Sequence, residues 1–257
     1  MKKQIIFVIF LISSLKCSAQ EEANFLENAF KNKSIDSLEV FLQKWASNEK
    51  AINFIDSLSK VQIYTYEIFE DFYNPFDLGK IGSGEFGIDL YKGLKNVVVQ
   101  NFIYIYVYKT KEINFPMLSN SDSLIQIKDS IVDFRPKIEF KNVRILYLTP
   151  KYSKIINEFL GNKYYPLGTG GIMNPARAKG TSEKKLDFLN SKMKIIYGHW
   201  GGYYHIETHP DVFSIDFNKD LTLAKVNYRL GYQGGEATYK RHNGKWIFID
   251  GHLTWIE

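Results

Sequence analysis

The stretch YGHWGGYYHIETHP concentrates residue types that can bind metals or transfer protons. It covers residues 197–210 and contains three of the five histidines in the chain. If residues 203–209 form a strand, then His205, Glu207 and His209 point to one face, because side chains alternate along a strand. Imidazole nitrogen and carboxylate oxygen are both good zinc ligands. This spacing therefore indicates a candidate metal or catalytic site.

The geometry of a strand limits how many of these side chains could share one ion. At roughly 3.3 Å per residue, His205 and His209 lie about 13 Å apart on a straight strand. We therefore expect at most an adjacent pair, such as His205 with Glu207, to bind one metal together with ligands from elsewhere. Three further histidines have no predicted position: His199, His242 and His252.

The aromatic residues of the same stretch suggest a ligand-binding face instead. Trp200, Tyr203 and Tyr204 flank Gly201 and Gly202, where the lack of side chains would let a flat ligand approach the backbone. Aromatic faces with polar tips suit sugars. A structural role is the third interpretation, with Trp200 in the core and the glycines in a turn or bulge. The residues of this stretch that we predict to bind a ligand are His199, Trp200, Tyr203 and His205.

A glycine-rich loop is the second candidate binding segment. LGTGGIMNPARAKGTS, residues 167–182, contains Arg177 and Lys179 and leads into a predicted helix. Backbone N–H groups at the start of a helix attract phosphate and carboxylate, and nearby cations strengthen this attraction. Because unstructured connections of more than roughly 12 to 15 residues are often functional, we assign Arg177 and Lys179 to ligand binding. The alternative is a surface loop with solvated charges.

Several motifs that would indicate an enzyme are incomplete. IGSGEFGIDLYKG, residues 81–93, matches G-x-G-x-x-G and resembles the phosphate loop of a protein kinase, but no H-R-D or D-F-G motif follows. A dinucleotide site needs a strand before the glycines and a helix after them, and here the predicted order is the reverse. The G-x-S-x-G, H-E-x-x-H and calcium-loop patterns are also missing. We therefore expect no cofactor and favour a protein that is not an enzyme.

Carboxylate pairs remain open as a source of catalysis. Glycoside hydrolases use two carboxyl groups about 5 to 10 Å apart, and the fold sets this separation. Glu207, Glu236 and Asp250 are the first residues to compare on this basis. No catalytic residue is fixed by the sequence, and the candidates are His205, Glu207 and Glu236.

The N-terminus resembles a signal peptide. Lys2 and Lys3 precede an apolar run of the usual length for such a segment, and we predict cleavage after Ala19, so that 1–19 is removed. Cys17 raises the alternative of a lipid anchor, which Lys16 beside it disfavours. The expected location is the periplasm or the extracellular space, as a soluble protein.

Composition narrows the classes of partner. The full chain carries a net charge of +5, which becomes +2 when Lys2, Lys3 and Lys16 leave with the signal peptide. Nucleic-acid binding requires a concentrated basic face, so we exclude it. No later segment is long and apolar enough to cross a membrane. A small molecule or glycan remains a candidate partner, and any protein partner is unknown.

The pattern of residues predicts an α+β fold. Apolar residues recur at helical spacing from Glu21 to about Tyr73, with Ser34 as a helix N-cap. Residues 96–108 are rich in β-branched and aromatic residues, which predicts a central strand. From Met193 onward, strand-like pieces alternate with turns, and Asn243-Gly244 favours a two-residue hairpin turn. The expected order is a helical N-terminal region, a mixed region and a C-terminal antiparallel meander sheet. A second strand is expected over 143–149, with helices over 150–161 and 182–192.

These elements predict a domain division after the signal peptide. We expect a helical region over 20–95 and an α+β domain over 96–257, or one continuous domain from residue 20. The ending YQGGEATYKRHNGKWIFI resembles the closing hairpin of nuclear-transport-factor-2-like domains, which implies a cone-shaped fold with a pocket. The blocks YNPFDLGKIGSGEFG and GTGGIMNPARAKG resemble blocks of an exported, uncharacterised Bacteroidota protein family, which supports export.

Three functional hypotheses follow. The first is an exported, non-enzymatic envelope protein that binds a small or glycan-like ligand near 167–180 and 198–209. The second is a metal-assisted or carboxylate-based hydrolase centred on His205, Glu207 and His209. It requires at least three ionisable side chains to converge on one point. The third is a module whose helical N-terminal region binds another protein, which an exposed apolar patch would favour.

Overall fold

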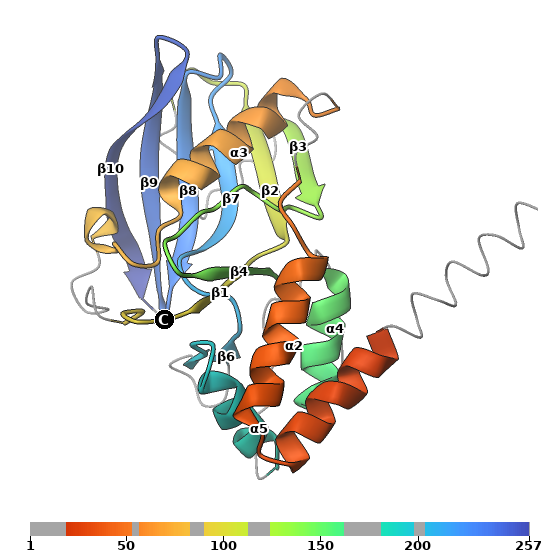
Figure 1. Cartoon of the computed structure of the whole chain (residues 1–257). Coiled ribbons are helices and arrows are strands. Elements are labelled where there is room, and N and C mark those ends of the chain that lie inside the picture. Colours follow the sequence, from red (N-terminus) through yellow and green to blue (C-terminus); the bar gives the residue numbers. More distant parts are fainter. Residues whose placement is uncertain are drawn as a thin grey trace, which may run out of the picture.

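A computed structural model describes residues 19–52, 57–82, 90–112, 124–161, 181–197 and 204–256. The predicted α+β class is confirmed, with helices concentrated in the N-terminal part and an antiparallel meander at the C-terminus (Figure 1). The signal-peptide prediction falls on residues 1–18, outside this description, apart from Ala19. A helix covers 19–31, and the further helices are α2 (Ile35–Asn48), α3 (Lys60–Phe72), η1 (Gly79–Ile81), α4 (Pro150–Phe159) and α5 (Thr181–Asn190).

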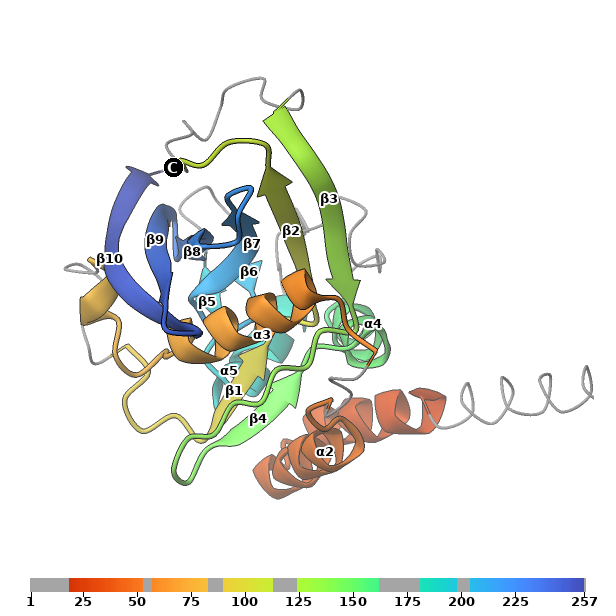
Figure 2. The same cartoon turned by 90° about the horizontal axis from the view of Figure 1, so that it is seen from above.

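A curved six-stranded sheet forms one half of the molecule (Figure 2). Its strand order is β10-β9-β8-β7-β2-β3, and every neighbouring pair is antiparallel except β2 with β7, which is parallel. The C-terminal meander predicted from residue 193 onward therefore joins a hairpin that forms much earlier in the chain. The strands are β2 (Phe102–Tyr108), β3 (Ile125–Val132), β7 (Asp211–Phe217), β8 (Leu223–Leu230), β9 (Gln233–His242) and β10 (Lys245–Ile256).

Local signals set the ends of several elements as predicted. The Ser34 hydroxyl accepts a hydrogen bond from the Ser37 N–H at the start of α2. Pro150 occupies the first turn of α4, and Gly161 follows that helix with a φ of 77°. Asn243 and Gly244 have φ values of 49° and 81°, as the turn between β9 and β10 requires.

One predicted strand is divided in two. The sequence indicates a single strand over 96–108, but β1 (Asn96–Val99) and β2 belong to different sheets. Between them, the Gln100 side chain accepts from the Val212 N–H and donates to the Val212 carbonyl, both at 2.7 Å. The Asn101 amide donates to the Phe134 carbonyl. These side chains form hydrogen bonds with the backbone of Val212 and Phe134, which would otherwise need a partner in a neighbouring strand. The chain can therefore leave one sheet and enter the next.

The small parallel sheet of β1 and β4 (Arg144–Tyr147) lies between two hydrophobic cores. Val97 and Val99 belong to the core under the six-stranded sheet, which α3 also covers. Val98 and Leu146 belong to a second core, built mainly by the helix over 19–31 with α2, α4 and α5. Because successive side chains of a strand point to opposite faces, two short strands can contribute side chains to both cores. Together, the two cores place the N-terminal helices beside elements from the middle of the chain.

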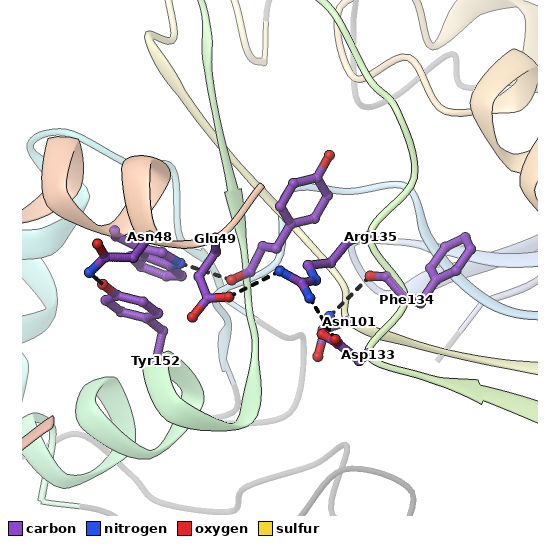
Figure 3. Close-up of polar contacts among 9 residues, drawn as sticks. Asn48, Glu49, Asn101, Asp133, Phe134, Arg135 and Tyr152 are labelled. Carbon is purple, nitrogen blue, oxygen red and sulfur yellow. Dashed lines mark hydrogen bonds and ion pairs between the residues drawn. The ribbon is translucent and has the colours of Figure 1, made fainter. Parts of the chain in front are cut away.

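A polar network joins these two halves of the molecule (Figure 3). Arg135 bonds to Glu49, at the end of α2, and to Asp133, after β3, with N–O distances of 3.4 and 2.7 Å. The Arg135 carbonyl accepts from the Ile52 N–H, and Asn101 donates to Asp133. We call Glu49, Asn101, Asp133 and Arg135 the Arg135 network. It fixes the end of α2 against the segment that follows β3.

Candidate functional site

The segment that contains the histidines is not one strand. Among its described residues, 197 and 204–210, Tyr197 ends β5 (Ile196–Tyr197), and Tyr204 and His205 form β6 (Tyr204–His205), which pairs with β5. The chain then runs beside β1, where the Thr208 N–H donates to the Val98 carbonyl and the Thr208 hydroxyl accepts from the Val98 N–H. The His209–Pro210 peptide bond is cis. These contacts bring the histidine segment to the free edge of β1, next to β7 and β8.

The predicted separation of His205 and His209 is wrong. Their ring centroids lie 5.0 Å apart with an interplanar angle of 65°, not about 13 Å. The distance of about 13 Å assumed an extended strand, but the chain leaves the sheet after His205. Both rings are buried, so the two histidines share one buried polar site.

Hydrogen bonding assigns the proton on His209. Nδ1 accepts from the Gly231 N–H at 2.6 Å, so in the neutral ring the proton is on Nε2. His209 is fully buried, and its Nε2 has no hydrogen-bond partner among the residues that the structure describes. Burial lowers the pKa of His209 well below its usual value, and His205 and Arg229 lower it further. The ring is therefore a neutral donor with an unused proton.

His205 has the opposite arrangement. Its Nε2 lies 3.4 Å from Nη1 of Arg229. Because a guanidinium can only donate, this contact assigns Nε2 as the acceptor and places the proton on Nδ1. Burial, with a smaller contribution from the Arg229 charge, lowers the pKa of His205 to about 4. His205 is thus neutral at pH 7.

Two carboxyl groups complete the cluster. Asp211 lies directly opposite Arg229 in the register of β7 and β8. Burial and the nearby Glu207 raise the pKa of Asp211 to about 7, although Arg229 lowers it. Burial also raises the pKa of Glu207. Two neighbouring carboxyl groups that resist ionisation together can exchange protons near neutral pH. We call His205, Glu207, His209, Asp211 and Arg229 the His205–Arg229 cluster.

Aromatic rings flank the arginine of the cluster. The guanidinium carbon of Arg229 lies 5.7 Å from the ring centroid of Phe213 and 5.6 Å from that of Trp255, within the range of a cation–π contact. Both aromatic side chains remain partly exposed, as do Glu207 and Asp211. The cluster is therefore buried at Arg229 and its histidines and borders solvent at its rings and carboxyl groups.

Gly234 makes room for the indole of Trp255. A Cβ atom built on Gly234 would lie 1.9 Å from Cε2 of Trp255, and one on Gly235 would lie 2.3 Å from Cζ of Tyr228. Non-bonded atoms do not approach this closely, so each ring packs directly against the backbone of a glycine. Tyr228 belongs to the core, whereas Trp255 faces Arg229. The pair Gly234-Gly235 thus positions one ring on each face of the sheet.

A second polar group lies further along the same face of the sheet. The Ser214 hydroxyl donates to Asp216 at 2.7 Å, and burial raises the pKa of Asp216 to about 6. Lys225 forms an ion pair of 2.7 Å with Glu236. The candidate catalytic residue Glu236 therefore already has a cationic partner. It lies opposite Asn227 on β8, two residues from Arg229.

The remaining predicted site residues fall into two groups. His242 is exposed, and His252 lies 3.5 Å from Asp250, with both side chains exposed on β10. They do not join the His205–Arg229 cluster. Five predicted ligand-binding residues lie outside the described residues: Arg177, Lys179, His199, Trp200 and Tyr203.

Two absences can be stated for the part of the chain that the structure describes. It holds no group of three or more His, Cys, Asp or Glu side chains that could bind a metal ion. None of its helices is long and apolar enough to cross a membrane. In the N-terminal helical region, Phe25, Ile35 and Val40 are exposed apolar side chains, and protein binding by this region stays a prediction.

Sequence reasoning missed Asp211, Phe213, Arg229 and Trp255. Alternation within the meander could have placed Arg229 and Asp211 on the non-core face of their strands. Asp211 follows His209 by two residues in the sequence, but nothing in the sequence indicated that Arg229 on β8 would lie next to the histidine segment. Comparisons with known proteins found no matching family model, no matching curated protein and no matching solved structure. The site must therefore be interpreted from its own chemistry.

Proposed function

We propose that this protein binds a small, glycan-like ligand at the His205–Arg229 cluster, without converting it. The observation that carries this proposal is the guanidinium of Arg229 between Phe213 and Trp255, next to partly exposed carboxyl groups. Aromatic faces cover the apolar face of a sugar ring, while charged groups hydrogen-bond its hydroxyls strongly. No complete catalytic motif accompanies the site.

Export remains part of this proposal. Its support is the charged and apolar N-terminal segment, with expected cleavage after Ala19. A glycan-binding role suits a protein of the periplasm or the extracellular space. N-terminal sequencing of the protein secreted or released from the periplasm tests this part, and an intact Met1 would contradict it.

The ligand-binding proposal is tested through the indole of Trp255. Trp255→Ala removes one ring beside Arg229, and Gly234→Ala forces the indole to move. We expect both variants to lose at least tenfold in affinity for mono- and disaccharides measured by isothermal titration calorimetry. Gly79→Ala is the matched control, because its new Cβ would lie 3.7 Å from Asp77 at ordinary contact distance. Equal sugar affinity in all three variants, or no binding by the wild type, would refute the proposal.

Acid–base catalysis is a second candidate because the pKa of Asp211 is raised to about 7. A carboxyl group that titrates near neutral pH can donate or accept a proton there. If the protein hydrolyses glycosides, Asp211→Asn abolishes turnover of nitrophenyl glycosides and keeps binding. A wild-type protein with no turnover between pH 5 and pH 8 would leave binding as the function.

A further inference from the structure

A row of aromatic side chains runs along β2 on the face of the sheet opposite the core. Phe102, Tyr104 and Tyr106 alternate along the strand with residues of the core, so their rings point to the other face. All three side chains are partly exposed. The ring centroid of Tyr104 lies 4.6 Å from that of Phe102 and 6.3 Å from that of Tyr106. These three rings form a continuous aromatic strip, which we call the β2 strip.

The strand register places the β2 strip on the same face as the His205–Arg229 cluster. Tyr104 lies opposite Ser214 in the parallel pairing of β2 with β7. Ser214 in turn lies opposite Asn227 on β8, two residues before Arg229. Side chains that lie opposite each other on paired strands share a face. The strip and the cluster are therefore two parts of one surface.

Polar side chains occupy the strands between the two aromatic parts. The Asn227 amide donates to the Ser214 hydroxyl at 2.9 Å, and that hydroxyl donates to Asp216 at 2.7 Å. Lys225 and Glu236 form an ion pair of 2.7 Å, and both side chains are partly exposed. Charged groups form strong hydrogen bonds with neutral partners such as hydroxyls. The surface thus has aromatic rings at both ends and charged groups between them.

The two aromatic ends are too far apart for one sugar ring to contact both. Trp255 lies on β10, and the strand order gives four steps from β10 to β2. Neighbouring strands lie about 4.8 Å apart, so these steps cover about 19 Å across the strands. A single sugar ring is similar in width to one aromatic ring. A ligand that contacts Trp255 and the β2 strip together must therefore contain several sugars.

We propose that the ligand is an oligosaccharide that crosses the strands from Trp255 to the β2 strip, where Tyr104 and Tyr106 bind its far end. Aromatic faces cover the apolar face of each end sugar, and Lys225 and Glu236 bond to hydroxyls between them. This inference rests on the proposed glycan-binding function and makes the class of ligand more specific. Because one chain joins both contacts, the second contact is intramolecular and raises the affinity.

The test compares sugars of increasing length. Cello-, malto- and chito-oligosaccharides, each from the monosaccharide to the hexasaccharide, are titrated into the wild-type protein in a calorimeter. We expect the hexasaccharide of at least one series to bind at least tenfold more tightly than its disaccharide. Part of any such gain is statistical, because a longer chain presents more copies of the same unit, so variants must separate the two causes.

Two substitutions remove the far contact. Tyr104→Leu and Tyr106→Leu each replace a flat ring by an apolar side chain. We expect each to weaken hexasaccharide binding at least fivefold and disaccharide binding less than twofold, whereas Trp255→Ala weakens both. Tyr66→Leu is the matched control, because Tyr66 is a partly exposed tyrosine on α3, which covers the core face of the sheet. Its affinities should equal those of the wild type. Melting temperatures verify that each variant is folded.

The outcomes separate this inference from the function on which it rests. If no sugar of any length binds the wild type, glycan binding itself fails, and the inference fails with it. If short sugars bind and the affinity does not rise with length, glycan binding stands and the role of the β2 strip is refuted. The same conclusion holds if the rise survives both tyrosine substitutions, since the gain is then statistical.

Discussion

The Arg135 network and the His205–Arg229 cluster both place an arginine near carboxyl groups, but the two arginines have different neighbours. Arg135 bonds directly to Glu49 and Asp133, so the positive charge is matched by two carboxylates. In the cluster, Arg229 lies opposite Asp211 in the register of β7 and β8 and also contacts a neutral histidine and two aromatic rings. The nearby carboxyl groups resist ionisation, because burial and their mutual repulsion raise the pKa of Asp211.

This difference separates a structural role from a binding role. Paired charges with direct hydrogen bonds hold segments together, and the Arg135 network lies where the two halves of the molecule meet (Figure 3). Shifted pKa values and an unused donor at His209 cost stability, and proteins retain such groups at sites where a ligand or a reaction needs them. We therefore expect substitutions in the network to lower stability, and substitutions in the cluster to change pH dependence and binding.

The largest expected effect is in the Arg135 network. Arg135→Met removes the charge that offsets the burial of Glu49, whose pKa burial raises and Arg135 lowers. We expect the free energy of unfolding in urea at pH 7 to fall by about 3 kcal/mol. Lys137→Met is the control, because the ion pair of Lys137 with Glu139 is exposed; its change should stay below about 0.5 kcal/mol. Equal effects of the two substitutions would show that the Arg135 network stabilises the protein no more than an exposed ion pair does.

His205→Gln should change the pH dependence of stability. The folded-state pKa of His205, about 4, lies below its usual value of 6.5, so its contribution to stability is full above pH 6.5. It is lost as the pH falls from 6.5 toward 4. Between pH 8 and pH 5, we expect the wild type to lose about 2 kcal/mol more unfolding free energy than the variant. If the wild type and the variant differ in unfolding free energy by the same amount at pH 8 and at pH 5, then folding does not lower the pKa of His205.

Glu207→Gln should stabilise the protein slightly. The folded-state pKa of Glu207 is raised, so ionisation at high pH destabilises the native state, and stability is lost as the pH rises through that pKa. We expect the variant to gain about 1 kcal/mol at pH 8 and almost nothing at pH 5. The pKa of Asp211 should fall as well, because Glu207 raises it. Carbon-13 NMR titration of the carboxyl groups measures this, and an unchanged Asp211 pKa would argue against their coupling.

The smallest expected effect is that of Asp133→Asn. Asp133 has a relative side-chain exposure of 45%, so solvent screens its ion pair with Arg135. We expect a loss of about 0.5 kcal/mol in urea unfolding. A loss as large as that for Arg135→Met would show that Asp133, and not Glu49, is the main partner of the arginine.

Elements with local causes could be predicted from the sequence. The cap at Ser34, the first turn of α4 at Pro150 and the hairpin at Asn243-Gly244 each depend on interactions within a few residues. The same holds for the α+β class, which follows from the order of helical and strand-like patterns. The division of residues 96–108 could not be predicted, because the Gln100 side chain pairs with Val212 more than a hundred residues away.

The candidate site shows the same limit. By itself, the sequence determined which residues near 205–209 can act as donors, acceptors or ligands, since that depends only on their chemical groups. Only the tertiary structure decided that His205 and His209 are neighbours and that Arg229 joins them opposite Asp211. The turn after His205 and the pairing of β7 with β8 are set by contacts between distant segments. The unused proton of His209 is likewise a property of the folded chain, because it exists only where Gly231 occupies the other nitrogen.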